Sequence, residues 1–257
     1  MYKIIAFSNQ KGGVAKSTSV INLAGILGEL GKKILVLDLD PQSNATQGLS
    51  VNVEPGKATV YDCLVKDIPL DEAIFKTGFK NIDIVPATLE LANAELEVAA
   101  SFGREMLLSE SIKNSKNLDY DYILIDLPPN LGLYTINGLS AADEVIIPVD
   151  AGVFSLSGVQ QLLKIIYKVK SKMNPRLNIA GVVFTKVDSR TKHAKEVREV
   201  LALEFKELLF ETQIRQNVKI AEAQAEGKPI NYYCNDCRGT EEYKMLAEEL
   251  INRELKK

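Results

Sequence analysis

The sequence contains no tryptophan, one histidine and only three cysteines among its 257 residues. Three thiols cannot all pair and are too few for a disulfide framework, which excludes a small disulfide-stabilised scaffold and fits a reducing compartment. Cys234 and Cys237 have the spacing of half a zinc knuckle, but there is no second pair of this kind, and the histidine, His193, lies far upstream. The pattern therefore favours two incidental thiols over a metal or redox site.

Long apolar runs are also missing. No stretch approaches the roughly 20 apolar residues that cross a bilayer, and the N-terminus lacks the charged and apolar regions of a secretion signal. Hydrophobic residues make up 46% and charged residues 25% of the chain, so a sizeable core can form and wholesale disorder is excluded. We expect a cytoplasmic globular protein.

The net charge of −3 gives no general attraction to nucleic acid. Its distribution is uneven, because residues 160–200 hold ten basic and three acidic side chains, a local net charge of +7. The sequence therefore indicates a basic face on an otherwise acidic body.

Predicted strands and helices alternate along the chain, which is typical of an α/β fold with a mostly parallel twisted sheet flanked by helices on both faces. No repeat or linker divides the sequence, so residues 1–257 are expected to form a single domain. The expected strands cover residues 3–8, 33–37, 82–86, 122–125, 144–149, 179–184 and 208–212. The expected helices cover residues 16–30, short pieces within 59–74 and 89–115, then 155–173, 192–203 and 240–255, the last with Thr240 as N-cap.

A glycine-containing loop, residues 11–18, follows the first expected strand and leads into the first helix. Such a loop gathers backbone N–H groups around an anion, and the helix dipole adds attraction. Gly12 and Gly13 let the backbone approach phosphates, Lys16 neutralises phosphate charge, and Ser17 offers a hydroxyl to Mg²⁺. The loop therefore predicts a nucleotide-binding site.

The loop departs from the strict phosphate-loop pattern G-x-x-x-x-G-K-[ST], because Gln10 and Ala15 occupy its two glycine positions. With the preceding Lys11, however, it reads Lys-Gly-Gly-x-x-Lys-Ser, which resembles the deviant Walker A loop of the ParA/MinD superfamily. Residues 38–46, beginning Asp-Leu-Asp-Pro-Gln, resemble that family's switch I, and residues 123–129, Ile-Leu-Ile-Asp-Leu-Pro-Pro, resemble its Walker B strand and switch II. Residues 148–149 and 185–191 fall where the Soj/ParA branch has similar segments.

The resemblance implies a P-loop ATPase that binds ATP and Mg²⁺ between the two subunits of a homodimer. Lys11 would be the signature lysine, which crosses the two-fold interface and stabilises charge on the transferring phosphoryl group, as an arginine finger does elsewhere. Lys16 would be the second catalytic lysine, and Asp40 would position the attacking water or receive its proton. The implied nucleotide-binding residues are Lys11, Gly12, Gly13, Val14, Ala15, Lys16, Ser17 and Thr18.

The same resemblance implies a Mg²⁺ site. Ser17 would hold the ion, and Asp126 would organise it largely through water. Two roles stay open for Asp38, a metal ligand or a structural carboxylate. Ala15 stands where the family usually has glycine. If that position needs a positive φ, the Cβ costs on the order of 1 kcal/mol and crowds the γ-phosphate, so we expect slow hydrolysis.

Residues 213–219 resemble the family's adenine-side loop. Asn217 matches that loop and implies adenine recognition, whereas Arg215 and Gln216 replace its proline and arginine, which leaves the contribution of Arg215 open. Both Arg215 and Asn217 are candidate nucleotide contacts.

Within this superfamily the same ATP-gated dimer serves several functions. Resemblance to the Soj branch implies chromosome or plasmid partition, with non-specific DNA bound by the basic stretch and a ParB-like centromere-binding partner that stimulates hydrolysis and releases the ATPase from the nucleoid. The candidate DNA contacts are Arg190, Lys192, Lys195, Arg198 and Lys219. No helix-turn-helix segment precedes the first strand, so operator-specific repression is not expected.

The alternative is a MinD-like membrane-cycling ATPase or another cargo-positioning ATPase. The tail, residues 250–257, lacks an aromatic anchor and has acids just upstream, so it is a poor membrane helix and no stable membrane association is expected. An iron-sulfur reductase is disfavoured because the cysteines are not beside the switch segments, and the switch I sequence disfavours a small-molecule kinase or synthetase.

Overall fold

Eight strands form one sheet in the structure, a computed structural model that describes residues 2–153 and 156–255. Their order across the sheet is β3-β4-β2-β5-β1-β6-β7-β8, and every pair is parallel except β3 with β4. The strands are β1 (Lys3–Phe7), β2 (Ile34–Asp38), β3 (Phe75–Lys76), β4 (Ile82–Val85), β5 (Tyr122–Asp126), β6 (Glu144–Asp150), β7 (Asn178–Val187) and β8 (Leu209–Arg215).

Alternate residues of the central strands face opposite sides of the sheet, as the period of a strand requires. In β1, Ile4 and Ala6 belong to one hydrophobic core, whereas Ile5 and Phe7 belong to the other. Both faces are therefore buried, which explains why these strands are continuous apolar runs without polar alternation.

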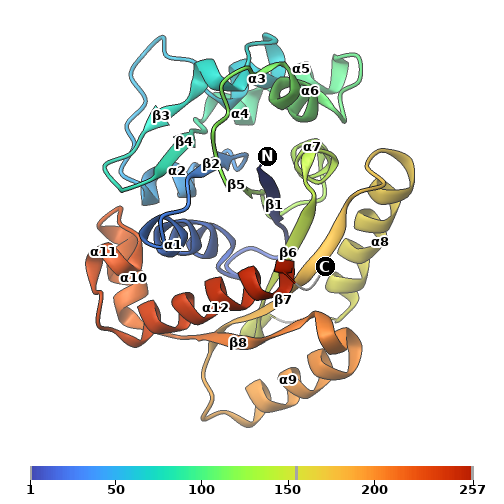
Figure 1. Cartoon of the computed structure of the whole chain (residues 1–257). Helices are drawn as coiled ribbons and strands as arrows, with labels where there is room; N and C mark the ends of the chain where they lie inside the picture. The colour runs from blue at the N-terminus through green and yellow to red at the C-terminus, as the bar shows by residue number, and fades with distance from the viewer. Residues whose placement is uncertain (1, 154–155, 256–257) are drawn as a thin grey trace.

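Helices cover both faces, which confirms the predicted α/β architecture. One face carries α1 (Lys16–Glu29), α10 (Val218–Ala225), α11 (Ile230–Tyr233) and α12 (Arg238–Leu255), which lie together in Figure 1. The other elements are α2 (Asn44–Gly48), α3 (Val60–Val65), η1 (Leu70–Ala73), α4 (Glu90–Asn93), α5 (Glu95–Ala100), α6 (Leu107–Asn114), α7 (Leu133–Ala141), η2 (Ala151–Val153), α8 (Leu156–Lys172), α9 (Lys192–Phe205) and η3 (Lys206–Leu208).

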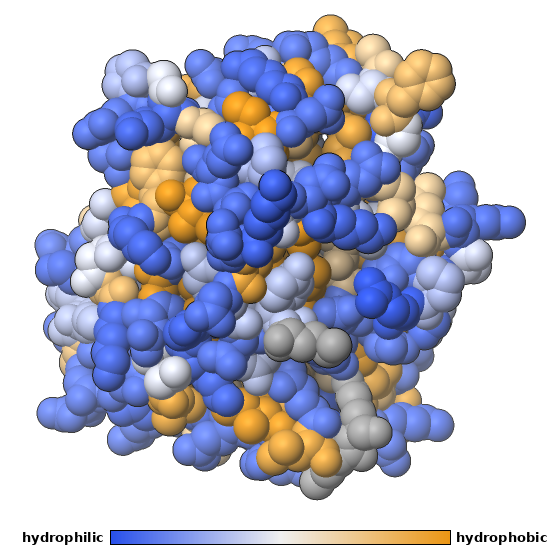
Figure 2. Space-filling model, turned by 45° about the horizontal axis from the view of Figure 1, so that its top comes forward, coloured by the Kyte–Doolittle hydropathy of each residue, from blue (hydrophilic) through white to orange (hydrophobic). Residues whose placement is uncertain are grey.

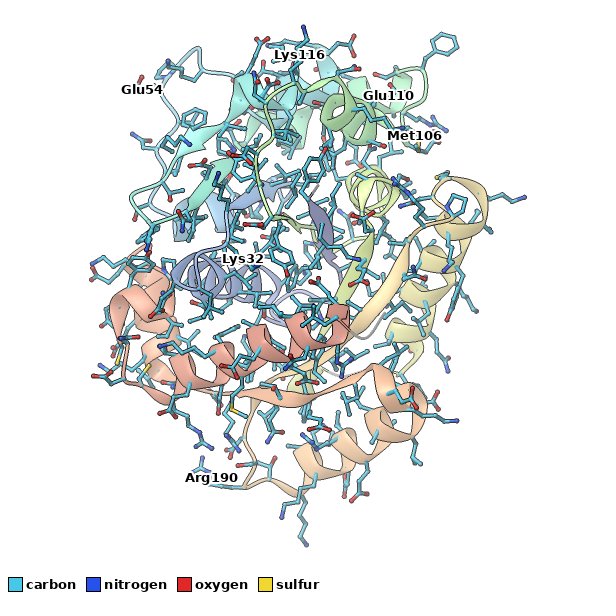
Figure 3. The ribbon with its side chains drawn as sticks, viewed as in Figure 1. Lys32, Glu54, Met106, Glu110, Lys116 and Arg190 are labelled. Atoms are coloured by element: carbon cyan, nitrogen blue, oxygen red, sulfur yellow. The ribbon has the colours of Figure 1, made fainter. Side chains whose placement is uncertain are left out.

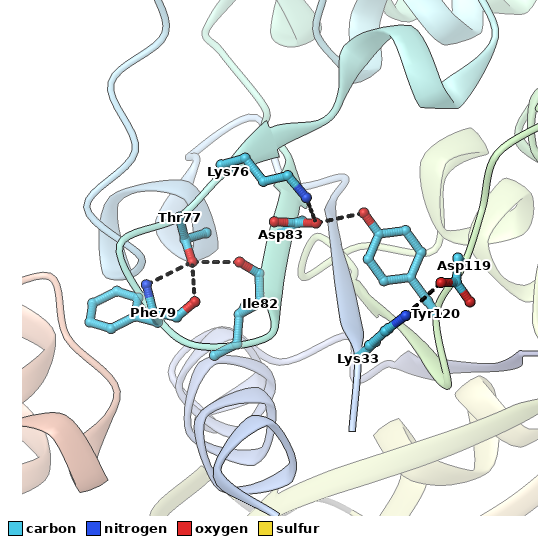
Figure 4. A network of polar contacts seen from close by, with 8 residues as sticks. All are labelled: Lys33, Lys76, Thr77, Phe79, Ile82, Asp83, Asp119 and Tyr120. Carbon is cyan, nitrogen blue, oxygen red and sulfur yellow. Dashed lines mark hydrogen bonds and ion pairs between the residues drawn. The ribbon is translucent and has the colours of Figure 1, made fainter. Parts of the chain in front are cut away.

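The short antiparallel strand β3 closes one edge of the sheet. Lys76 on β3 and Tyr120 both donate to the Asp83 carboxylate of β4, at 2.6 and 2.7 Å (Figure 4). The Lys76–Asp83 contact adds to the backbone pairing between β3 and β4, which is short because β3 has two residues.

Most predicted elements are present, and one predicted cap is wrong. The last helix begins at Arg238, so Thr240 lies inside its first turn and is not the N-cap. The Thr240 hydroxyl instead donates to Cys234 O at 2.7 Å. The expected start of another helix, Ser155, lies outside the described residues.

Candidate nucleotide-binding site

The loop between β1 and α1 lies at the carboxyl edge of the parallel strands, where open α/β sheets bind ligands. Polar contacts hold it against the neighbouring strands. Asn9 donates to Pro148 O at 2.7 Å and accepts from the Lys11 amide at 3.0 Å, while the Thr185 hydroxyl donates to Val14 O at 3.0 Å. The loop is therefore fixed by the ends of β6 and β7 and not by its own hydrogen bonds alone.

Two residues of the loop have left-handed backbone. Gly13 has φ +77°, which glycine adopts without steric cost. Ala15, the residue just before α1, has φ 65° and ψ 34°. The position of Ala15 therefore does have a positive φ, the condition under which we expect its Cβ to be unfavourable, because this conformation favours glycine.

The two lysines of the loop are placed differently. Lys16 is 6% exposed, and its Nζ donates to Lys11 O at 3.3 Å. Burial lowers the pKa of Lys16, and the carboxylates of Asp126 and Asp40 oppose that shift. The side chain of Lys11, in contrast, is exposed and makes no ion pair with any residue that the structure describes.

The carboxylates of Asp126 and Asp40 interact with Lys16, and Asp126 at the end of β5 is in register with Asp38 at the end of β2. Burial, together with the neighbouring Asp38 carboxylate, raises the pKa of Asp126 well above its usual range. Among the described residues no donor reaches either Asp126 oxygen with good hydrogen-bond geometry, although the Ser17 hydroxyl is close enough to oppose the rise in pKa. A hydrated Mg²⁺ ion is held by oxygen atoms, and its water molecules donate to carboxylate oxygens that have no other donor. Asp126 and Ser17 therefore fit the ion.

Asp38 differs from Asp126 because its oxygens are satisfied. They accept from the Asp40 amide at 3.1 Å and from the Thr46 amide and hydroxyl at 2.9 and 2.8 Å. Burial still raises the pKa of Asp38 to about 6. These contacts shape the switch I backbone and favour the structural alternative for Asp38.

Asp40 is held by the Gln42 amide, which donates to its carboxylate at 3.0 Å.

A cavity of about 570 Å³ opens beside the loop, large enough for a nucleotide. It brings together the loop, switch I, the end of β7, the adenine-side segment and α12. The lining residues predicted as nucleotide or catalytic contacts are Gly12, Gly13, Ala15, Lys16, Ser17, Thr18, Asp40, Arg215 and Asn217. Lys11 and Val14 were also predicted, but they are not among the lining residues.

The adenine-side wall is organised by a buried carboxylate on α12. Glu242 accepts from the Arg215 guanidinium at 2.7 Å and from the Arg215 amide at 2.8 Å. Asn217 is the N-cap of α10, because its side chain accepts from the Lys219 amide at 2.9 Å. Arg215 is thus fixed at the cavity edge, and Asn217 shapes the backbone there.

Four cavity residues lie outside every motif of the sequence, Ile220, Ala221, Gln224 and Tyr243, and two of them make polar contacts with α1. Gln224 of α10 lies 3.1 Å from the Thr18 hydroxyl, and Tyr243 of α12 contacts Ser19 at 3.4 Å. Tyr243 is fully buried and resembles an ordinary core residue of an amphipathic helix, so no local signal marks it.

The predicted DNA contacts lie outside the cavity. Arg190 is 89% exposed, projects away from the body in Figure 3, and pairs with Asp188 at 2.8 Å. Lys219 pairs with Glu222, and Arg198 donates to Gln213. These contacts are local, so the structure does not draw the three side chains into one site.

Comparison with known proteins decides the family. A family model described as an AAA domain matches residues 2–179. The chain is 43% identical to the sporulation initiation inhibitor protein Soj of Bacillus subtilis, over 97% of this chain and 98% of that protein. It is 41% identical to the chromosome-partitioning ATPase Soj of Treponema pallidum, with 99% of each chain covered. The chain belongs to the ParA/Soj family of partition ATPases.

Solved structures support the nucleotide assignment for this ParA/Soj family member. Cobyrinic acid a,c-diamide synthase from Mycobacterium smegmatis, solved with ADP and magnesium, has a TM-score of 0.85 and 31% identity over 99% of this chain and 96% of that one. MinD from Pyrococcus horikoshii, solved with Mg-ADP, has a TM-score of 0.77 and 28% identity over 97% and 96%. The chain is an ATPase that uses ATP and Mg²⁺, and bound Mg²⁺ supplies charge neutralisation at the phosphates.

Proposed function

We propose that this chain is an ATP-gated partition ATPase that dimerises around ATP, binds non-specific DNA as the dimer, and moves a chromosome or plasmid with a ParB-like partner that stimulates hydrolysis. The observation that carries the proposal is the unequal placement of the two loop lysines. Lys16 lines the cavity, whereas the exposed Lys11 does not. A lysine outside its own cavity can act on a nucleotide held by a second copy.

Within one subunit, Lys16 would hold the phosphates, Ser17 would hold the ion, and Asp126 would accept from the ion's water molecules. Asp40 lies at the cavity wall, 5% exposed, where it can hold a water in line with the terminal phosphate. The partner copy's signature lysine then adds positive charge where phosphoryl transfer develops negative charge. Hydrolysis removes the γ-phosphate that this lysine binds, so the dimer dissociates.

Non-specific DNA binding rests on the basic stretch. Lys192 and Lys195 on α9 are exposed and, within the part of the chain that the structure describes, form no ion pair. Lysines of this kind bind phosphates without reading bases. They are stronger candidates than Arg190 and Lys219, whose charges are already paired with Asp188 and Glu222.

A membrane-cycling function is disfavoured by α12. Its apolar residues Tyr243, Leu246 and Leu250 are buried in the core, so they are not available to a bilayer. No helix within residues 2–153 and 156–255 is both long and apolar enough to cross a membrane. On the face shown in Figure 2, hydrophobic residues form separate small patches among hydrophilic ones.

The test compares Lys11→Ala with Lys16→Ala. We expect Lys11→Ala to bind a fluorescent ATP analogue but to show no ATP-dependent mass increase in light scattering, whereas Lys16→Ala loses nucleotide affinity itself. Asp40→Ala, blocked in hydrolysis, should accumulate as the dimer with ATP and not with ADP. A Lys11→Ala protein that dimerises as the wild type does would refute the two-subunit site.

DNA binding is tested with the Asp40→Ala dimer in gel shifts over a series of salt concentrations. Removing Lys192 and Lys195 should weaken binding on any sequence and lower the salt slope by about one for each DNA phosphate that the dimer no longer neutralises. Lys113→Ala with Lys116→Ala, two exposed lysines outside the basic stretch, is the matched control. Equal losses in both double variants would contradict this surface, and liposome binding without DNA binding would favour the membrane alternative.

A further inference from the structure

Cys234 and Cys237 lie in a tight turn between α11 and α12. The Cys237 amide donates to Cys234 O at 3.4 Å. Such a turn brings its first and last Cα atoms within about 7 Å, the separation that a disulfide can span. Both residues are partly exposed, so a soluble thiol reagent can reach them. The sequence favoured two incidental thiols, but this geometry allows the two cysteines to form a disulfide.

The two thiols have different surroundings. The Cys237 carbonyl accepts from the amides of Thr240 and Glu241, at 2.9 and 3.2 Å, so Cys237 is the N-cap of α12. Its sulfur lies 3.6 Å from the Thr240 hydroxyl. Partial burial alone would raise the pKa of Cys237, but the Thr240 amide and further donors lower it on balance. The pKa of Cys234 is raised, first by its contact with Cys237.

We propose that Cys234 and Cys237 form a redox-active dithiol that closes to an intrachain disulfide, with Cys237 as the attacking thiol and Cys234 as the resolving thiol. A low-molecular-weight disulfide is the oxidant. The Cys237 thiolate attacks one of its sulfurs, which forms a mixed disulfide and expels one small thiolate. The Cys234 thiol then loses its proton to solvent and attacks the Cys237 sulfur, which expels the second small thiolate. The two cysteines lose two electrons and two protons in total, and the reagent gains them as two thiols.

The dithiol is joined to the nucleotide cavity through the first turn of α12. Arg238, next to Cys237, donates to the Glu242 carboxylate at 3.0 Å, and the same carboxylate fixes Arg215 at the cavity edge. A Cβ built on Gly239 would lie 3.2 Å from the Asn217 side chain, so this turn also packs against the adenine-side segment. Closing the disulfide draws the Cys237 sulfur away from the Thr240 hydroxyl, which it contacts at 3.6 Å in the first turn of α12, and this weakens that turn and with it the cavity wall.

The first experiment oxidises the full chain with oxidised glutathione at a series of thiol–disulfide ratios, followed by alkylation and peptide mapping. We expect one intrachain bond between Cys234 and Cys237. Cys63 is an internal control, because it is 2% exposed and burial raises the pKa of its thiol to about 12, so it should stay reduced. Glutathione adducts without closure, or bonds only between chains, would overturn the proposal.

The second experiment uses Cys234→Ser and Cys237→Ser, both checked for folding by circular dichroism. With an aromatic disulfide reagent near neutral pH, Cys234→Ser should react faster than Cys237→Ser, and the reverse order would overturn the assigned roles. Oxidation should weaken the affinity of wild type for a fluorescent ATP analogue by about two- to five-fold, the effect of losing one weak hydrogen bond, and dithiothreitol should restore it. An affinity unchanged by oxidation, or changed equally in Cys237→Ser, would overturn the link to the cavity.

Discussion

Replacing Ala15 by glycine should stabilise the protein slightly and speed ATP turnover. At φ 65° and ψ 34°, an L-residue is about 1–2 kcal/mol less stable than in right-handed backbone. Glycine relieves this strain but adds unfolded-chain entropy that costs about 0.4–1 kcal/mol. The free energy of unfolding should therefore rise by up to about 1.5 kcal/mol, a melting shift of roughly 2–4 °C for each kcal/mol at this chain length.

Two neighbouring glycines serve as controls. Gly13 has φ +77°, and a Cβ built there meets no atom within 4 Å. Gly13→Ala therefore introduces the backbone strain without a clash, and it should lower the melting temperature by a similar amount. Gly12 has the same open surroundings without a positive φ, so Gly12→Ala should be neutral or slightly stabilising.

The assay is thermal denaturation without nucleotide, followed by steady-state ATP hydrolysis. If Ala15→Gly melts lower than wild type while Gly13→Ala melts higher, the loop is not held in left-handed backbone and the reasoning fails. A kcat that does not change in Ala15→Gly would show that the methyl group does not crowd the γ-phosphate. The stability and turnover results are separate, because the strain is present before ATP binds.

Three further changes test the carboxylates around the cavity. Raising the pH from about 4 to about 7 should lower the free energy of unfolding through Asp38, whose pKa burial raises from 3.8 to about 6. The folded protein holds this proton more tightly than the unfolded chain, so the stability is present below the unfolded pKa and is lost as the pH rises through about 6. Urea denaturation of Asp38→Asn should show a flatter dependence. Asp126→Asn should melt at the same or a higher temperature without nucleotide, because the amide cannot ionise in this buried place, yet titrations with and without Mg²⁺ should show that the metal-dependent part of ATP affinity is lost. Glu242→Gln should raise the KM for ATP and cost about 1–3 kcal/mol of stability through its weakened bonds to Arg215, with kcat nearly unchanged; an unchanged KM would contradict its positioning role.

The central sheet could be predicted from the sequence because its strands are buried on both faces. Residues such as Ile123, Leu124 and Ile125 form an uninterrupted apolar run that has few alternatives in a chain of alternating elements. The loop of residues 11–18 could also be recognised from the sequence, because phosphate binding needs particular residues at fixed spacing along one segment. These features depend on neighbours in sequence.

The features that sequence reasoning missed depend on contacts between distant segments. The strand β3 has only two residues, too few to show a strand pattern, and its Lys76 forms an ion pair with the carboxylate of Asp83 on β4. The start of α12 was misplaced because Thr240 followed by two glutamates looks like a cap. In the fold, however, the Thr240 hydroxyl is used by Cys234 O, and Cys237 takes the cap position.

The cavity brings together residues from the first and the last part of the chain. Residues of the N-terminal loop form one wall, and Arg215 and Tyr243 from the last part of the chain form another. Tyr243 also contacts Ser19 one turn into α1, the helix that follows the glycine-containing loop. A ligand that touches both walls stabilises their docking, and by linkage whatever loosens that docking weakens the ligand. The helix α12 is therefore part of the cavity wall, although none of its residues belongs to a nucleotide motif.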